Sequence, residues 1–218
     1  MNNRPTFYID GSNAVGKTTV SRYIAEQTDC TVIHGDAFFG NGMNKAQQAI
    51  FKRFGDFPRP GKVSEFFARY LTSPETIQGF LFDIRPFIEE DIIETRQKLS
   101  KNILTGIPKD ATYNYHTNTN GWIIEFVTSS AFYEEWANAD RRYVIFALLE
   151  KIVTNALERG RPDDSEEVVI NKYNAEMPTI VKARNVNYTL INQQHFTESQ
   201  FQTEADKTII KDIMEIIY

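Results

Sequence analysis

The stretch TFYIDGSNAVGKTT (residues 6–19) decides the fold. It fills the pattern G-x-x-x-x-G-K-[ST], in which Gly11 and Gly16 let the backbone curl so that successive N–H groups point at a phosphate. Lys17 is expected to reach the β- and γ-phosphates of a nucleotide, and the hydroxyl of Thr18 to ligate Mg²⁺. The helix that opens after the loop adds the positive end of its dipole. The residues expected to bind the nucleotide are Gly11, Ser12, Asn13, Ala14, Val15, Gly16, Lys17, Thr18 and Thr19.

A glycine-rich turn could match this pattern by chance. With glycine at about 7% of residues, a chance match is expected on the order of once in a hundred chains of this size. Here the match follows an apolar strand expected over residues 6–10 and opens an amphipathic helix expected over 17–28. This context favours phosphate binding over a chance turn.

Size and composition fit one α/β domain over residues 1–218. Hydrophobic residues make up 41% of the chain, enough for a complete core, and one cysteine excludes a disulfide framework. The net charge of −5, without a basic run, argues against nucleic acid as the main partner. Because no apolar run reaches membrane-spanning length and no signal-peptide core is found, we expect a soluble cytoplasmic protein with no membrane partner.

Short apolar runs alternate with helical patterns along the chain. Strands are expected at 6–10, 31–34, 122–127, 143–149 and 188–192. Helices are expected at 17–28, 77–101, 151–158 and 204–217, with one more after 167. The region 37–105 is expected to be helical with breaks, and 106–121 to be a loop or a small β excursion. This alternation is typical of a three-layer α/β fold, in which helices cover both faces of a five-stranded parallel sheet.

Two acidic residues are expected at the carboxyl ends of strands, where ligands gather in parallel sheets. Asp36 follows the second strand and could take a proton from an acceptor hydroxyl or hold Mg²⁺; the alternative is a loop or helix-capping aspartate. Glu125 interrupts an apolar strand, where an unpaired charge would be costly. It could act as a base or a partner of Mg²⁺, or face solvent on an edge strand.

Three arginines are candidates for phosphate contacts. Arg159 and Arg161 lie in the polar segment 158–167, where they could close over a triphosphate and neutralise the charge that develops during phosphoryl transfer. A solvated charged turn is the alternative, and the acids that follow are expected to cap the next helix. Arg85 lies in an otherwise apolar helix and could reach a phosphate or extend to solvent.

Aromatic and histidine residues give weaker signals. Phenylalanines are concentrated between residues 38 and 67. Aromatics at helical spacing usually form core, but Phe39 and Phe67 are the ones we expect to contact a ligand. The three histidines show no metal-ligand spacing and are expected in core, strand-end or surface positions.

The order of these motifs resembles the nucleoside and nucleoside-monophosphate kinases of the P-loop class, nearest to the thymidylate kinase and deoxynucleoside kinase branch. Besides the loop, the resemblance is carried by FLFDIRPFIEED (80–91), GWIIEFVTSSAFY (121–133) and ERGRPDD (158–164). It implies the P-loop kinase fold, an acceptor site under the helical region 37–105 and an arginine-bearing lid at 158–167. It also implies ATP and Mg²⁺ as cofactors and a small nucleoside or nucleotide as the acceptor.

Individual residues follow from the resemblance. Lys17 and Thr18 would hold phosphate and Mg²⁺, Arg85 would reach the phosphate of the acceptor, and Arg159 and Arg161 would be lid arginines. The family usually closes its third strand with an acid followed by arginine, whereas this chain has EF (125–126). After the second strand the segment GDAFF (35–39) looks more like small-molecule and nucleoside kinases, in which an aspartate at this place acts as base.

We therefore expect an ATP- and Mg²⁺-dependent kinase that transfers the γ-phosphate to a (deoxy)nucleoside or a nucleoside monophosphate. Asp36 or Glu125 would orient or deprotonate the acceptor, and Asp36 would help Thr18 to hold the metal. Two alternatives stay open: a P-loop kinase for another small-molecule or modified-nucleotide hydroxyl, and a non-catalytic nucleotide-binding regulator. A homodimer through the long helices is an expectation that rests on the resembling families alone.

Overall fold

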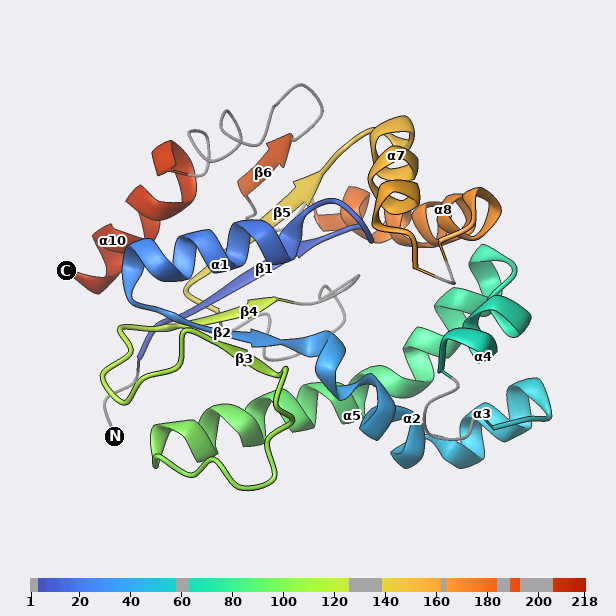
Figure 1. Ribbon diagram of the computed structural model, residues 1–218, viewed down its shortest axis with the longest axis horizontal. Helices are drawn as coiled ribbons and strands as arrows, with labels where there is room; N and C mark the ends of the chain where they lie inside the picture. Colours follow the sequence, from blue (N-terminus) through green and yellow to red (C-terminus); the bar gives the residue numbers. More distant parts are fainter. Residues whose placement is uncertain (1–3, 58–62, 126–138, 162–163, 184–188, 193–205) are drawn as a thin grey trace.

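The computed structural model describes residues 4–57, 63–125, 139–161, 164–183, 189–192 and 206–218 (Figure 1). The strands are β1 (Thr6–Gly11), β2 (Thr31–His34), β3 (Thr112–Tyr113), β4 (Trp122–Glu125), β5 (Arg141–Phe146) and β6 (Thr189–Asn192). The α-helices are α1 (Lys17–Thr28), α2 (Phe39–Lys45), α3 (Gln47–Phe54), α4 (Val63–Tyr70), α5 (Pro74–Ser100), α7 (Leu149–Arg159), α8 (Glu166–Ala183) and α10 (Lys211–Ile217). A 3₁₀ turn, Gly35–Phe38, joins β2 to α2, and a π-helical turn, Asp206–Ile210, precedes α10.

The strands form one sheet in the order β3-β2-β4-β1-β5-β6. The pairs β2–β4, β4–β1, β1–β5 and β5–β6 are parallel, which confirms the predicted five-stranded parallel sheet. The short strand β3 adds an antiparallel edge beside β2, and it is the small β excursion expected between 106 and 121. β1, which carries the P-loop at its end, is therefore central in the sheet.

Helices cover both faces of the sheet, so that the structure has three layers (Figure 1). Along β1, Phe7 and Ile9 pack with α1, α7 and α10, whereas Tyr8 between them packs with α2 to α5. This alternation is the period of two that an extended strand requires. A hydrophobic core thus fills each side of the sheet, and the carboxyl ends of the strands point towards α7 and α8 (Figure 1).

The structure corrects several predicted boundaries. The strand expected at 143–149 is wrong at its end, because β5 stops at Phe146. The apolar run continues beyond the strand to Leu149, which begins α7. The helix expected from residue 77 begins at Pro74, because Ser73 caps it. The side chain of Ser73 accepts a hydrogen bond from the N–H of Thr76 at 3.3 Å, and the hydroxyl of Thr76 accepts one from the N–H of Ser73 at 3.1 Å.

The last predicted helix, 204–217, is also corrected, because its first described turn is π-helical before α10 begins. The acids expected to cap the helix after residue 167 do not do so among the described residues. Ser165 takes that place, since its Oγ accepts from the N–H of Val168 at 3.4 Å, and Glu166 is already in the first turn of α8. Residues 126–127, at the end of the predicted third strand, lie outside the described residues.

Candidate functional site

The P-loop has a backbone conformation that only glycine suits at two points. Gly11 has φ +152°, and a Cβ there would lie 2.2 Å from the carbonyl oxygen of Ile145 in β5. Gly16 has φ +92°, in the left-handed region, directly before α1 begins. The loop therefore passes close to the neighbouring strand and curls into the amino-terminal end of α1, the arrangement that directs N–H groups and the helix dipole at an anion.

Lys17 is the first residue of α1, and its side chain folds back over the loop. It is 5% exposed, and its Nζ donates to the carbonyl oxygens of Gly11 and Ser12, each at 2.8 Å. Ser12 is buried as well, and its Oγ has no hydrogen-bond partner within the described part of the chain. A buried ammonium group and an unpartnered buried hydroxyl in one loop fit the binding of phosphate oxygens.

Thr18 and Glu125 meet at the start of α1. Thr18 Oγ1 donates to Glu125 Oε1 at 2.6 Å, and Ser21 Oγ donates to Glu125 Oε2 at 3.3 Å. The contact arises because β4 pairs with β1 so that Glu125 lies opposite Ile9, two residues before the loop. β4 lies between β2 and β1, so the alternative of an edge-strand glutamate facing solvent is wrong. A hydroxyl and a carboxylate are oxygen ligands of the kind that Mg²⁺ takes.

His34 adds a third contact to this carboxylate. It is the register partner of Glu125 across β2 and β4, and its Nδ1 is 2.5 Å from Glu125 Oε2. Burial acts to raise the pKa of Glu125, but His34, the hydroxyl of Thr18 and the charge of Lys17 outweigh it and hold the pKa below its usual value. Glu125 is thus kept ionised beside Thr18, and His34 occupies one of the strand-end positions expected from the sequence.

Asp36 lies in the 3₁₀ turn that follows β2, and its side chain is exposed. The surrounding protein still limits the hydration of the carboxyl and raises its pKa to about 6. The negative charge of Glu125 also raises this pKa. The positive charges of Lys17, Arg161 and His34 act to lower it. The charges that act on Asp36 bring three predicted site residues, Lys17, Glu125 and Arg161, into its neighbourhood.

Arg159 ends α7 and forms an ion pair that the sequence did not indicate. Its Nε and Nη2 donate to the two carboxylate oxygens of Asp164 at 2.8 and 2.7 Å, and Asp164 is 3% exposed. Nη1 and Nη2 of Arg159 also lie 3.4 Å from Asn13 Oδ1 in the P-loop. Arg159 therefore lies beside the loop, in a bidentate pair, while Arg161 is exposed.

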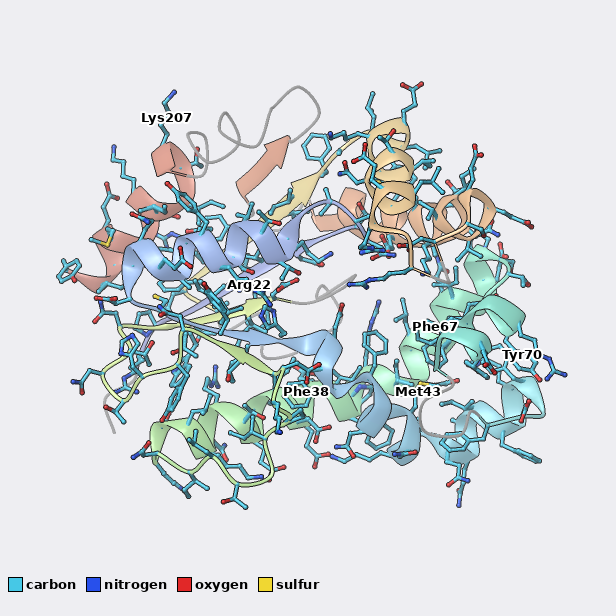
Figure 2. All side chains as sticks on the ribbon, in the orientation of Figure 1. Arg22, Phe38, Met43, Phe67, Tyr70 and Lys207 are labelled. Carbon is cyan, nitrogen blue, oxygen red and sulfur yellow. The ribbon has the colours of Figure 1, made fainter. Side chains whose placement is uncertain are left out.

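The predicted acceptor residues lie on the α5 side of the sheet. Phe39 begins α2, Phe67 is in α4, and their rings make an edge-to-face contact with centroids 6.1 Å apart. Both are partly buried against the core, and Figure 2 shows Phe67 together with Met43 of α2 on this side. Arg85 of α5 is 7% exposed, so the alternative of an arginine that extends to solvent is wrong. The structure therefore brings the two phenylalanines together on this side of the sheet.

Three residues at or near the loop were not predicted as site residues from the sequence: Asn155, Asp164 and Glu176. Asn155 Nδ2 donates to the carbonyl oxygen of Ala14 at 3.0 Å, and Glu176 Oε2 accepts from the N–H of Asn13 at 2.9 Å. All three come from α7, α8 or the link between them. No local pattern indicates Asn155 or Glu176, because each lies more than 140 residues in sequence from its partner in the loop, whereas Asp164 lies five residues from Arg159.

Two features are absent from the described residues. No group of three or more His, Cys, Asp or Glu side chains there is placed to hold a metal ion. This is compatible with Mg²⁺, which proteins usually bind through one or two side chains together with substrate phosphates. Within the same residues, no helix has the length and apolar character needed to cross a membrane.

Among known proteins, the chain resembles solved structures but matches no protein-family model and no curated protein sequence. Among solved structures, the Thermus thermophilus protein TT1252 is 16% identical, with a TM-score of 0.61 over 96% of this chain and 97% of that one. Shikimate kinase from Acinetobacter baumannii, in complex with shikimate, is 15% identical, with a TM-score of 0.52 over 98% and 95%. Dephospho-CoA kinase from Campylobacter jejuni is 18% identical, with a TM-score of 0.51 over 97% and 98%.

At these identities the likeness shows the fold. The chain has the three-layer fold of P-loop kinases, along nearly its whole length and that of the matched structures. The expectation of this fold from the sequence is confirmed. The thymidylate kinase branch gains no support, because the named kinases among these structures are kinases of other small molecules.

Proposed function

We propose that the chain is an ATP- and Mg²⁺-dependent kinase that transfers the γ-phosphate to a hydroxyl group of a small molecule, with a (deoxy)nucleoside as the expected class. The observation that carries the proposal is the position of Asp36. It is an accessible carboxyl whose pKa responds to the charges of Lys17, Glu125 and Arg161. A P-loop alone indicates nucleotide binding, but a carboxyl in this position can receive the proton of an acceptor hydroxyl.

Each residue of the site has a role in this proposal. The loop N–H groups and Lys17 would bind the donor phosphates, and the hydroxyl of Thr18 with the ionised Glu125 would hold Mg²⁺, directly or through water. The metal would supply charge neutralisation on the phosphates. Asp36 would orient the acceptor hydroxyl and accept its proton. Arg161 would bring positive charge to the phosphoryl group during transfer.

The acceptor region offers an apolar contact. Three cations of α2 to α4 lie in ion pairs with carboxylates: Lys45 with Asp91, Arg53 with Asp83, and Arg69 with Asp56. Surface ion pairs of this kind contribute little free energy, so they do not decide between an acceptor with and without a phosphate. The edge-to-face pair of Phe39 and Phe67 would provide an apolar contact for a flat acceptor.

A nucleoside monophosphate is the second candidate acceptor, and Arg85 favours it. This guanidinium is buried in the helical region, where a planar donor group suits a phosphate. Replacing Arg85 by glutamine tests this candidate. If the acceptor carries a phosphate, Arg85→Gln should raise KM for nucleoside monophosphates at least tenfold. If the acceptor is a nucleoside without a phosphate, Arg85→Gln should leave KM for nucleosides unchanged.

ADP formation tests the proposed activity. The assay contains ATP, Mg²⁺ and one member of a panel of nucleosides, nucleoside monophosphates and other small hydroxy compounds. We expect at least one hydroxyl acceptor to raise ADP formation far above the rate without acceptor. The Lys17→Ala variant should abolish that increase, and Lys101→Ala, on an exposed turn, should retain it. Tight ATP binding without stimulation by any acceptor would contradict the proposal and leave the nucleotide-binding regulator.

A further inference from the structure

Glu176 connects α8 to the P-loop in a way that the proposed reaction does not use. Its side chain is 3% exposed, and Oε2 accepts a hydrogen bond from the N–H of Asn13 at 2.9 Å. Asn13 is separated from it by 163 residues in sequence. A carboxylate of α8 is thus bonded to the backbone of the loop that we propose to bind phosphates.

The same turn of the loop is held from α7. Asn155 Nδ2 donates to the carbonyl oxygen of Ala14 at 3.0 Å, and the guanidinium of Arg159 lies 3.4 Å from Asn13 Oδ1. Ala14 has φ +60°, a conformation that costs free energy for a residue other than glycine. Side chains of both α7 and α8 therefore stabilise the turn Asn13–Ala14.

Opposing charges act on the Glu176 carboxyl. Burial raises the pKa of this carboxyl to about 7. The charge of Lys17, the N–H of Asn13 and the charge of Lys172 in α8 act to lower the pKa. The negative charge of Asp10 in β1 acts to raise it. The helix α5 packs against α8 beside Glu176 through an uncharged contact, in which Gln78 Nε2 donates to the carbonyl oxygen of Ala175 at 3.2 Å. Glu176 can therefore exist in either protonation state near neutral pH.

We propose that Glu176 is a positioning residue of the P-loop and that its carboxylate takes up a proton from solvent when a nucleoside triphosphate binds. The inference rests on the proposed donor site. Triphosphate oxygens bring negative charge into the loop and share Lys17, so the ionised form of a buried neighbouring carboxylate is disfavoured. The neutral carboxyl keeps its carbonyl oxygen as an acceptor for Asn13, so the loop stays held while the repulsion is removed.

A pH dependence follows from this uptake. A group that binds a proton on complex formation makes affinity fall as pH rises through and above its pKa in the free protein. Affinity for a triphosphate should therefore decrease between about pH 7 and 8.5. Glu176→Gln keeps an acceptor oxygen for Asn13 and has no ionised form. The variant should bind more tightly at the upper end of this range and show a flatter dependence.

Titration calorimetry measures the proton directly. The non-hydrolysable analogue AMPPNP with Mg²⁺ is titrated at pH 7.5 into the full-length protein, in buffers of different ionisation enthalpy. We expect the wild type to take up about half a proton more per nucleotide than Glu176→Gln. The control is Glu167→Gln, on an exposed position of the same helix, which should match the wild type. Equal proton uptake by the wild type and Glu176→Gln, with both binding the nucleotide, would overturn the inference.

A second measurement covers the case in which Glu176→Gln does not fold. Infrared difference spectra of the wild type, recorded before and after addition of AMPPNP and Mg²⁺, should gain the band of a protonated carboxyl group. Loss or absence of this band on binding contradicts the inference and leaves the proposed function standing. Failure of the wild type to bind any nucleotide would overturn both.

Discussion

Asp36 is the residue on which the reaction depends most in this account. Replacing it by asparagine keeps the size and removes the proton acceptor. Turnover should fall about a hundredfold or more, while ATP binding stays within about twofold of the wild type. Steady-state kinetics and calorimetry on the same preparation check this, with Asp110→Asn on an exposed loop as the matched control. Unchanged turnover would move the role of base to Glu125.

The pH profile of the wild type gives a second view of Asp36. A base acts in its ionised form, and the pKa of Asp36 is raised to about 6. Because kcat/KM reports the pKa values of the free enzyme, kcat/KM for the acceptor should fall as pH decreases through about 6, a higher pH than an ordinary aspartate would give. Activity that stays constant down to pH 5 would contradict a rate-limiting role for this carboxyl.

Gly11 tests the backbone of the loop. Alanine there would place its Cβ 2.2 Å from the carbonyl oxygen of Ile145, at a φ of +152° that suits glycine. Since the carbonyl oxygen belongs to the backbone of a central strand and cannot move aside, we expect Gly11→Ala to lower the free energy of unfolding by roughly 3 kcal/mol or more. Gly40→Ala in α2 is the control, because no atom lies within 4 Å of its added Cβ. Urea unfolding of the two variants compares them, and equal stability would contradict the geometry.

At the scale of elements, the ion pair of Arg159 and Asp164 joins the end of α7 to the residues before α8. Removing Arg159 would leave the carboxylate of Asp164 buried without its partner, which costs about 3 kcal/mol. Arg159→Ala should therefore be clearly less stable in urea than Asp164→Asn, in which no buried charge remains. If Arg159→Ala unfolds like the wild type but loses turnover, Arg159 acts on the triphosphate, and the lid predicted at 158–167 gains support.

Elements whose signals are local were predicted well. The strand before the P-loop and the helix after it follow from consecutive residues, and Glu125 was singled out because a charge interrupts an apolar strand. The capping box at Ser73 was also present in the sequence as a Ser-Pro start with Thr76 three residues on, and it was missed. By contrast, β3 has two residues, too few for a period of two to show.

The partners of the site could not be predicted, because they depend on register and packing. His34 contacts Glu125 only because β2 and β4 pair with these two residues opposite each other. Glu176 reaches Asn13 across 163 residues of sequence. The pair of Arg159 and Asp164 is local, five residues apart, but nothing in the segment distinguishes Asp164 from the other acids around it as the partner. The acceptor specificity depends on the same kind of long-range arrangement on the α5 side of the sheet.

At the scale of the whole molecule, donor binding should stabilise the fold, because the loop, α1, α7 and α8 all meet at the proposed nucleotide site. A ligand at a hundredfold its Kd adds about 2.7 kcal/mol to the free energy of unfolding. For a chain of this size that corresponds to a rise of about 5 to 10 °C in Tm. Thermal unfolding with and without ATP and Mg²⁺ should show this rise in the wild type and not in Lys17→Ala. A Tm that ATP leaves unchanged at millimolar concentration would contradict a donor site.

Transfer of labelled γ-phosphate tests the central claim most directly. The protein is incubated with Mg²⁺, ATP labelled in the γ-phosphate and the best acceptor of the panel, and products are separated. We predict that the label appears on the acceptor, one phosphate for each ADP formed, and that Asp36→Asn reduces this transfer about a hundredfold. Label that appears only as inorganic phosphate, or that stays in ATP with every acceptor, would contradict the account.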